Sequence, residues 1–95
     1  MLFLVISTPV PTRPSAVQDQ RRKYWPWAQD KLDRGLPKSF YARTGRGAVA
    51  VFDVDSNETL HSLLNEWAEI VPAEFDIYPL IDADAIKSFL GEEAD

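Results

Sequence analysis

The chain has 95 residues, a length that suits one domain near the lower end of the usual size range. Its hydrophobic content of 45%, with three Trp, three Tyr and five Phe, is ample for a packed core and argues against a disordered chain. The absence of cysteine excludes disulfides and thiolate metal sites, and the single histidine excludes a multi-histidine metal site within one chain.

Charge is unevenly distributed along the sequence. Nine of the ten Lys and Arg lie between Arg13 and Arg46, where only three acids oppose them, whereas from residue 47 onward one Lys faces twelve acids. The formal net charge of −5 argues against nucleic acid as a partner. The basic half could attract an anionic small molecule, although the commoner explanation is that oppositely charged faces meet within the fold or across a dimer.

The first predicted element is a strand over residues 2–6, which are all apolar and therefore suit a strand that is covered on both faces. This stretch is too short for a signal-peptide core or a membrane span, and no basic residue precedes it. We therefore expect a cytoplasmic chain with no membrane partner. Residues 7–14 contain three prolines and predict a stiff, extended connection.

A helix is predicted over residues 14–34, because proline suits its first turn and Gly35 suits its end. The internal Pro26 removes one backbone hydrogen bond at a cost of roughly 3 kcal/mol, so we expect the helix to kink or break there. The flanking indoles of Trp25 and Trp27 either wall a ligand pocket or pack in the core or at a subunit contact.

Residues 36–43 are interpreted as a second strand, and the two glycines within residues 44–47 predict a hairpin turn. The turn leads into a third strand over residues 47–54, which is almost wholly apolar. Because side chains alternate across a strand, both faces of this third strand are expected to be covered.

The second helix is predicted over residues 56–70, with Pro72 ending it. Asp55 stands where the N-cap is expected, and Glu58 follows three residues later, as in a capping box. Leucines and a tryptophan repeat at helical spacing, so one face of this helix is committed to a core.

A fourth strand is predicted over residues 74–80. A short closing helix is predicted over residues 82–91, capped by Asp82 and ended by Gly91. The acidic residues 92–95 are expected to fray.

The order strand, helix, strand, strand, helix, strand predicts an α+β, ferredoxin-like fold, with a four-stranded antiparallel sheet and helices on one face. No repeat or linker divides residues 1–95, which we treat as one domain. Helices on one face leave the other face bare, and soluble monomers avoid a large exposed apolar patch. We therefore expect a homodimer in which a second copy covers the sheet.

Several stretches resemble the muconolactone Δ-isomerase family, over nearly the whole chain. They are Met1-Leu2-Phe3, Val51-Phe52-Asp53-Val54-x-Ser56-x-x-x-Leu60-His61-x-x-Leu64, and Asp76-Ile77 with Leu80. The resemblance implies a dimeric α+β barrel, which can assemble into a larger ring such as a decamer. It also implies a cofactor-free enzyme of aromatic catabolism that moves a proton on an unsaturated lactone carboxylate.

Such an isomerisation needs a general base and a group that stabilises the enolate. The family's suspected catalytic carboxylate lies on the first helix, where the matching residues 22–25 here include no Asp or Glu. His61 matches the family motif, which implies a proton shuttle, although a lone helical histidine is more often structural. Tyr24 could donate a hydrogen bond to an oxyanion or merely pack. These two residues are the catalytic candidates.

The substrate-binding candidates are arginines and aromatic residues near the first helix. Guanidinium groups offer a forked pair of donors for a substrate carboxylate, although a solvated surface role is commoner for each arginine. We expect a pocket between the sheet and the first helix. The arginine candidates are Arg21, Arg22 and Arg43, and the expected walls are Tyr24, Trp25, Trp27 and Phe40.

Three functions remain open from the sequence. The first is a cofactor-independent, isomerase-like enzyme that acts on a small anionic lactone or a related metabolite. The second is a cofactor-free oxygenase or cyclase of the same barrel architecture, which the aromatic content and the missing carboxylate favour. The third is a dimeric small-molecule-binding protein without catalysis. Fold analogy alone cannot choose among them.

Overall fold

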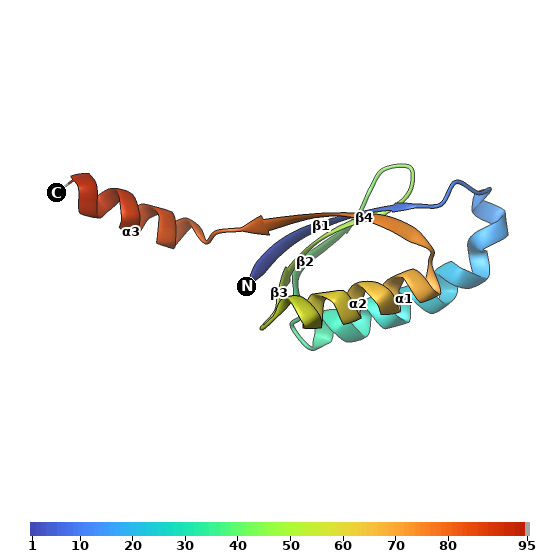
Figure 1. Ribbon diagram of the computed structural model, residues 1–95. Helices are drawn as coiled ribbons and strands as arrows, with labels where there is room; N and C mark the ends of the chain where they lie inside the picture. The colour runs from blue at the N-terminus through green and yellow to red at the C-terminus, as the bar shows by residue number, and fades with distance from the viewer. Residues whose placement is uncertain (95) are drawn as a thin grey trace.

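The computed structural model describes residues 1–94, and the side chains of residues 1–88. A curved sheet lies over two helices, and a third helix projects from one end (Figure 1). The sheet is four-stranded and antiparallel throughout, with strand order β2-β3-β1-β4. Its strands are β1 (Leu2–Pro9), β2 (Pro37–Ala42), β3 (Ala48–Asp53) and β4 (Ala73–Leu80). The prediction of an α+β, ferredoxin-like fold is therefore confirmed.

The two faces of the sheet differ because side chains alternate along each strand. On β1, Phe3, Val5 and Ser7 are buried under the helices, and their neighbours on β1 point to the open face and are half-buried. The central strands β1 and β3 therefore supply the core. The open face carries an apolar set that no element of the described chain covers: Leu2, Leu4, Ile6, Tyr41, Val49, Val51, Tyr78 and Leu80.

The first helix is preceded by a 3-10 turn over Pro14–Val17, with proline in its first turn as predicted. The helix α1 (Gln18–Asp33) then runs without interruption through Pro26, so the alternative of a broken helix is wrong. Pro26 and Arg22, whose carbonyl would have received the lost hydrogen bond, both lie on the exposed side, where water can satisfy that carbonyl. Gly35 follows the helix with a φ of 74°, a conformation that favours glycine.

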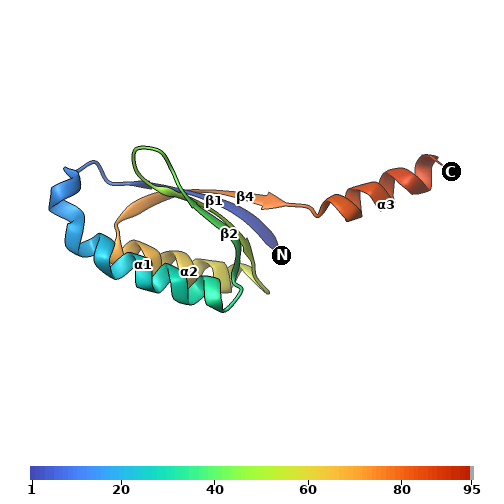
Figure 2. The ribbon, with the colours of Figure 1, turned by 180° about the vertical axis from the view of Figure 1, so that it is seen from behind.

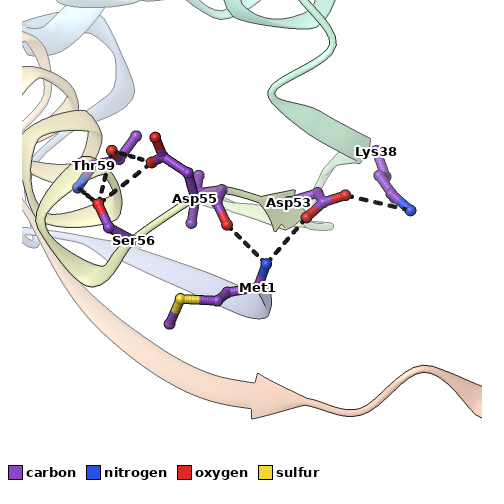
Figure 3. Close-up of polar contacts among 7 residues, drawn as sticks. Met1, Lys38, Asp53, Asp55, Ser56 and Thr59 are labelled. Atoms are coloured by element: carbon purple, nitrogen blue, oxygen red, sulfur yellow. Dashed lines mark hydrogen bonds and ion pairs between the residues drawn. The ribbon is translucent and has the colours of Figure 1, made fainter. Parts of the chain in front are cut away.

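The second helix, α2 (Asn57–Ile70), is capped by Ser56 and not by the predicted Asp55. The Ser56 Oγ accepts a hydrogen bond from the backbone N–H of Thr59 at 3.1 Å (Figure 3). Asp55 instead accepts a hydrogen bond from the Thr59 hydroxyl, which lowers the pKa of the Asp55 carboxyl. The cap lies one residue later than expected because the extended backbone of Ser56 turns its short side chain toward the first helical turn.

Ionic contacts join the ends of three strands at Asp53 (Figure 3). The amino group of Met1 lies 3.3 Å from the Asp53 Oδ1 and donates to the carbonyl oxygen of Val54 at 2.7 Å. Lys38 of β2 lies 3.6 Å from the Asp53 Oδ2. These groups are largely exposed, so the contacts align the strand ends more than they stabilise the fold.

The third helix, α3 (Ala83–Ala94), continues past Gly91, so the predicted end of the helix is wrong, and only Asp95 of the expected frayed tail lies outside the described residues. The helix extends away from the sheet in both views (Figures 1 and 2). The radius of gyration of 15.9 Å exceeds the value of about 12 Å that a compact chain of this length would have. Helix α3 therefore adds length to the molecule, and its described side chains, residues 83–88, are exposed and lie outside the core.

Candidate functional site

A cavity of about 250 Å³ lies where the last residues of β1 meet the β2–β3 hairpin and the first half of α1. Ser7 and Pro9 form its β1 side, and Gly45 and Gly47 lie on its hairpin side. The lining side chains that could bind a ligand are those of three arginines, a tyrosine and two tryptophans: Arg21, Tyr24, Trp25, Arg43, Arg46 and Trp67.

Tyr24 is a buried residue of this cavity with a polar group that lacks a partner in the described part of the chain. Its side chain is 5% exposed, and its ring lies 5.3 Å from the ring of Trp67 between centroids. Its phenol oxygen is buried and has no hydrogen-bond partner in the described part of the chain. Burial raises the pKa of the Tyr24 phenol, so the group stays neutral and keeps a proton to donate. An unpaired buried donor is costly, and a ligand oxygen would satisfy it.

Arg43 is fixed at the cavity by contacts with β1. One guanidinium nitrogen, Nη1, donates to the carbonyl oxygen of Ser7 at 3.0 Å and to the Thr8 Oγ1 at 3.1 Å. This approach depends on Gly47, whose φ is 105° and whose place would not admit a side chain. A Cβ atom there would overlap the Ser7 carbonyl oxygen and come within 3.3 Å of the Arg43 Cδ.

Arg46 is a cavity residue that the sequence interpretation missed. Its Nη1 donates to the Thr12 carbonyl oxygen at 3.1 Å and lies 3.3 Å from the Thr12 Oγ1. The signal available in the sequence was its place in the same two-glycine turn as Gly45 and Gly47, close to Arg43. Both hairpin arginines are thus held by backbone carbonyls, which leaves the remaining guanidinium N–H groups for a ligand.

The cavity has a positive electrostatic character. Arg21 extends from α1 into its lining, and no Asp, Glu or His lies among the lining residues in the part of the chain that the structure describes. The nearby Asp19 forms its ion pair with Arg22, at 3.7 Å, and not with a cavity arginine. Three guanidinium groups and one neutral phenol therefore converge on a space that suits a small anion.

The structure brings together four of the predicted site residues: Arg21, Tyr24, Trp25 and Arg43. Trp27 and Phe40 do not line the cavity. The Trp27 Nε1 donates to Glu66 at 3.3 Å, and the ring of Phe40 packs 5.6 Å from that of Trp67. Both rings pack near the ring of Tyr24, at 5.9 Å for Trp27 and 6.2 Å for Phe40 between centroids, and a substrate-binding role for these two residues stays a prediction from the sequence.

His61 lies apart from Tyr24. It lines a separate depression of about 310 Å³ between α2 and β4, together with Leu60 and Ile77, and it is exposed. Its Nε2 lies 3.0 Å from the Asn65 Nδ2. The two depressions share no lining residue, so His61 and Tyr24 of one chain do not face one ligand. A catalytic role for His61 stays a prediction from the sequence.

Two further properties bear on possible ligands. Within the part of the chain that the structure describes, no group of three or more metal-ligating side chains is placed to hold a metal ion. No helix among the described residues has the length and apolar character needed to cross a membrane.

Comparison with solved structures finds the same fold in 5-chloro-2-hydroxyhydroquinone dehydrochlorinase (TftG) from Burkholderia phenoliruptrix AC1100, solved in complex with 2,5-dihydroxybenzoquinone. The match has a TM-score of 0.60 and 17% sequence identity, and it covers 90% of this chain and 98% of that one. At this identity the similarity shows the fold alone. It supports the α+β architecture that the resemblance to muconolactone Δ-isomerase implied, and it does not single out that enzyme.

No curated protein matches the chain. A family model described as "Domain of unknown function" matches residues 1–94. Because that match spans nearly the whole sequence, the chain belongs to this family, DUF3303.

Proposed function

We propose that the protein is a homodimeric, cofactor-independent, isomerase-like enzyme that moves a proton on a small anionic ring compound, such as an unsaturated lactone carboxylate of aromatic catabolism. The observation that carries the proposal is the convergence of three guanidinium groups and the unpaired phenol of Tyr24 on one cavity. The volume of about 250 Å³ lies below the range of about 300–1,000 Å³ for drug-sized ligands and suits a single-ring metabolite.

The cavity residues would divide the work by their chemistry. Arg21 and Arg46 would anchor the carboxylate of the ligand from opposite sides, since guanidinium groups bind carboxylates through paired hydrogen bonds. Tyr24 would donate its proton in a hydrogen bond to the oxygen that becomes negative in an enolate. The indole of Trp25, which is 48% exposed, would form a wall against the ring.

The fold match supports a small oxygenated ring as the ligand class. The name of TftG denotes a substituted hydroquinone as substrate, and its solved complex holds a dihydroxybenzoquinone. Such compounds carry the ring oxygens that a buried phenol donor and guanidinium groups recognise.

A binding protein without catalysis is the second candidate. The observation that favours it is that the cavity lining, in the described part of the chain, includes no Asp, Glu or His to serve as a general base. Proton transfer would then require a base from the ligand itself or from a second protomer. A cofactor-free oxygenase or cyclase acting on an electron-rich ring would not need a carboxylate at this place.

The proposed dimer rests on the open face of the sheet. Tyr41 is 69% exposed and Tyr78 is 51% exposed, although both lie beside half-buried aliphatic side chains on the same face. A second sheet placed face to face, about 10 Å away, would remove this apolar surface from water. Two-fold symmetry makes such a face self-complementary.

The test is an ultraviolet assay with (+)-muconolactone and a set of hydroxylated benzoates and quinones, together with proton exchange followed by NMR in D₂O. We expect ligand binding to quench the fluorescence of Trp25, and we expect solvent deuterium to enter the ligand at the carbon next to its carbonyl group. Binding without exchange would favour the binding protein, and neither binding nor exchange across the set would refute the proposal.

A matched pair of variants makes the test specific. Arg21→Gln removes a guanidinium from the cavity, and we expect it to weaken ligand binding at least tenfold. Arg22→Gln removes the neighbouring guanidinium, which does not line the cavity and pairs with Asp19, so we expect binding to stay within twofold of the parent protein. Equal effects of the two changes would mean that only the overall charge matters.

A further inference from the structure

The described side chains of helix α3, residues 83–88, are all exposed. Ile81, just before the helix, is 70% exposed, and Ile86 within it is 43% exposed. The helix extends past the end of β4 in line with that strand (Figures 1 and 2). An isolated helix of 12 residues is marginally stable in water, so α3 requires a surface to pack on.

The strand register excludes the chain's own cavity as that surface. Leu80, the last residue of β4, pairs with Leu2 at the start of β1. The cavity is lined by Ser7 and Pro9, at the other end of β1. The seven residue steps from Leu2 to Pro9 separate the two ends of β1 by about 23 Å, and α3 leaves the sheet in the opposite direction.

The charge of the α3 segment indicates which surface of a second copy of the chain it would contact. Residues 82–95 contain five carboxylates and one lysine. Helix α2 carries acidic residues on its exposed surface, including Glu58 and Glu69, and would repel this segment. The cavity lining carries Arg21, Arg43 and Arg46 and, among the described residues, no carboxylate, so it would attract this segment, although Glu74 of β4 lies at the same end of the sheet.

Symmetry brings these two parts together. A two-fold axis that runs the two open sheet faces antiparallel places the α3 end of one protomer beside the cavity end of the other. Helix α3, about 18 Å long, is then long enough to pass along the cavity mouth.

We propose that α3 of one protomer crosses to a second copy of this chain, lies at the mouth of that copy's cavity, and brings its carboxylates to the arginines there. Each cavity would then be completed by the partner subunit, which supplies the acidic group that the chain's own lining lacks. The inference rests on the proposed homodimer and goes beyond it, because a sheet-to-sheet dimer does not require the helix to cross.

The test uses paramagnetic relaxation between protomers. The chain has no cysteine, so a nitroxide attached to a Ser88→Cys variant labels α3 alone. This variant, without ¹⁵N, is mixed and allowed to exchange subunits with ¹⁵N-labelled parent protein, so that any broadening is intermolecular. We expect broadening of hairpin amides from Thr44 to Gly47. A nitroxide on a Ser62→Cys variant, which labels exposed α2, should leave these amides sharp.

A charge-reversal pair provides a second measurement on the full chain. Asp84 of α3 and Glu58 of α2 are both exposed acids in the first turn of a helix, so their replacement by lysine has the same effect on the helix dipole. We expect Asp84→Lys to weaken the dimer about tenfold in sedimentation equilibrium, with a reduced dependence on salt. Glu58→Lys should leave the dimer dissociation constant within twofold.

The possible results separate this inference from the proposed function. A stable dimer with hairpin broadening supports the crossing helix. A stable dimer that binds ligand, with broadening on α2 residues or none, overturns the crossing helix alone. A monomer at micromolar concentration overturns both the crossing helix and the proposed homodimer, whether or not the cavity binds a ligand.

Discussion

The hydroxyl of Tyr24 is the group whose removal tests the site most directly. A Tyr24→Phe variant keeps the ring and its contacts with Trp67 and Phe40, and removes only an oxygen that is buried without a partner in the described part of the chain. An unsatisfied buried polar group costs about 1–3 kcal/mol. We therefore expect the ligand-free variant to be more stable than the parent protein by about 1 kcal/mol, at the low end of that range.

Ligand binding should change in the opposite direction. If Tyr24 donates to a ligand oxygen, its loss removes a hydrogen bond worth about 1–1.5 kcal/mol, which corresponds to an affinity roughly tenfold lower. Thermal unfolding without ligand should show a rise in Tm of about 4–8 °C per kcal/mol for a domain of this size. A gain in stability with a loss of affinity is the pattern expected of a residue kept for function.

The pH dependence provides an independent check on the same residue. Burial raises the pKa of Tyr24 above the ordinary value of 10.0, so the folded state holds this proton more tightly than the unfolded chain does. The fold therefore bears no cost of ionising this phenol below pH 10, and its stability falls as pH rises above that value. Tyr24→Phe should remove this alkaline loss, whereas Tyr41→Phe, at a 69% exposed position, should not. A destabilised variant with unchanged affinity and an unchanged alkaline slope would refute the assignment.

Three other changes test the surroundings of the site and the dimer. Gly47→Ala should destabilise the fold by at least about 2 kcal/mol in urea unfolding, because it adds an overlap with the Ser7 carbonyl oxygen to backbone strain. Gly45→Ala, where space is open, should cost only about 1 kcal/mol. Equal losses of stability in the two variants would contradict the predicted overlap at Gly47. Thr59→Ala should raise the pKa of Asp55 toward 3.8, which an NMR titration would detect. A lowered carboxyl pKa stabilises the fold at a pH above the pKa of the unfolded chain, so the variant should lose less stability than the parent as pH falls. An unmoved pKa would contradict the hydrogen bond from Thr59 as the cause of the lowered value. Leu4→Lys should convert the proposed dimer to a monomer in sedimentation, whereas Ser62→Lys on exposed α2 should not; a dimer that survives Leu4→Lys would exclude the open face as the interface.

The order and type of the elements could be predicted because hydrophobic spacing and turn residues agree along the chain. The errors in helix boundaries occur where the local sequence is compatible with two conformations. Asp55 and Ser56 are both good caps, and only the backbone geometry decides between them. Pro26 predicts a break or kink, yet α1 continues because the Arg22 carbonyl that loses its hydrogen bond lies on the solvent-exposed side of the helix. Gly91 predicts the end of the last helix, but α3 continues to Ala94.

The candidate site was harder to predict than the fold because a cavity depends on side-chain direction. Tyr24, Trp25 and Trp27 lie within four residues, but successive residues of a helix point about 100° apart, so two of them face the cavity and the third faces α2. Arg46 reaches the cavity because the hairpin folds against the segment just after β1, where Arg46 donates to the carbonyl oxygens of Val10 and Thr12. That contact requires knowledge of which strands pair, which no local pattern contains.

The position of β1 in the middle of the sheet has a consequence for synthesis on the ribosome. Both of its neighbours come later in the chain, since Leu2 pairs with Asp53 of β3 and with Leu80 of β4. A nascent chain therefore carries an unpaired, strongly apolar first strand until almost all of it has been translated. Such long-range pairing slows folding and leaves an aggregation-prone apolar segment exposed. Chaperones can bind this segment, so the yield of the protein in cells should depend on chaperones.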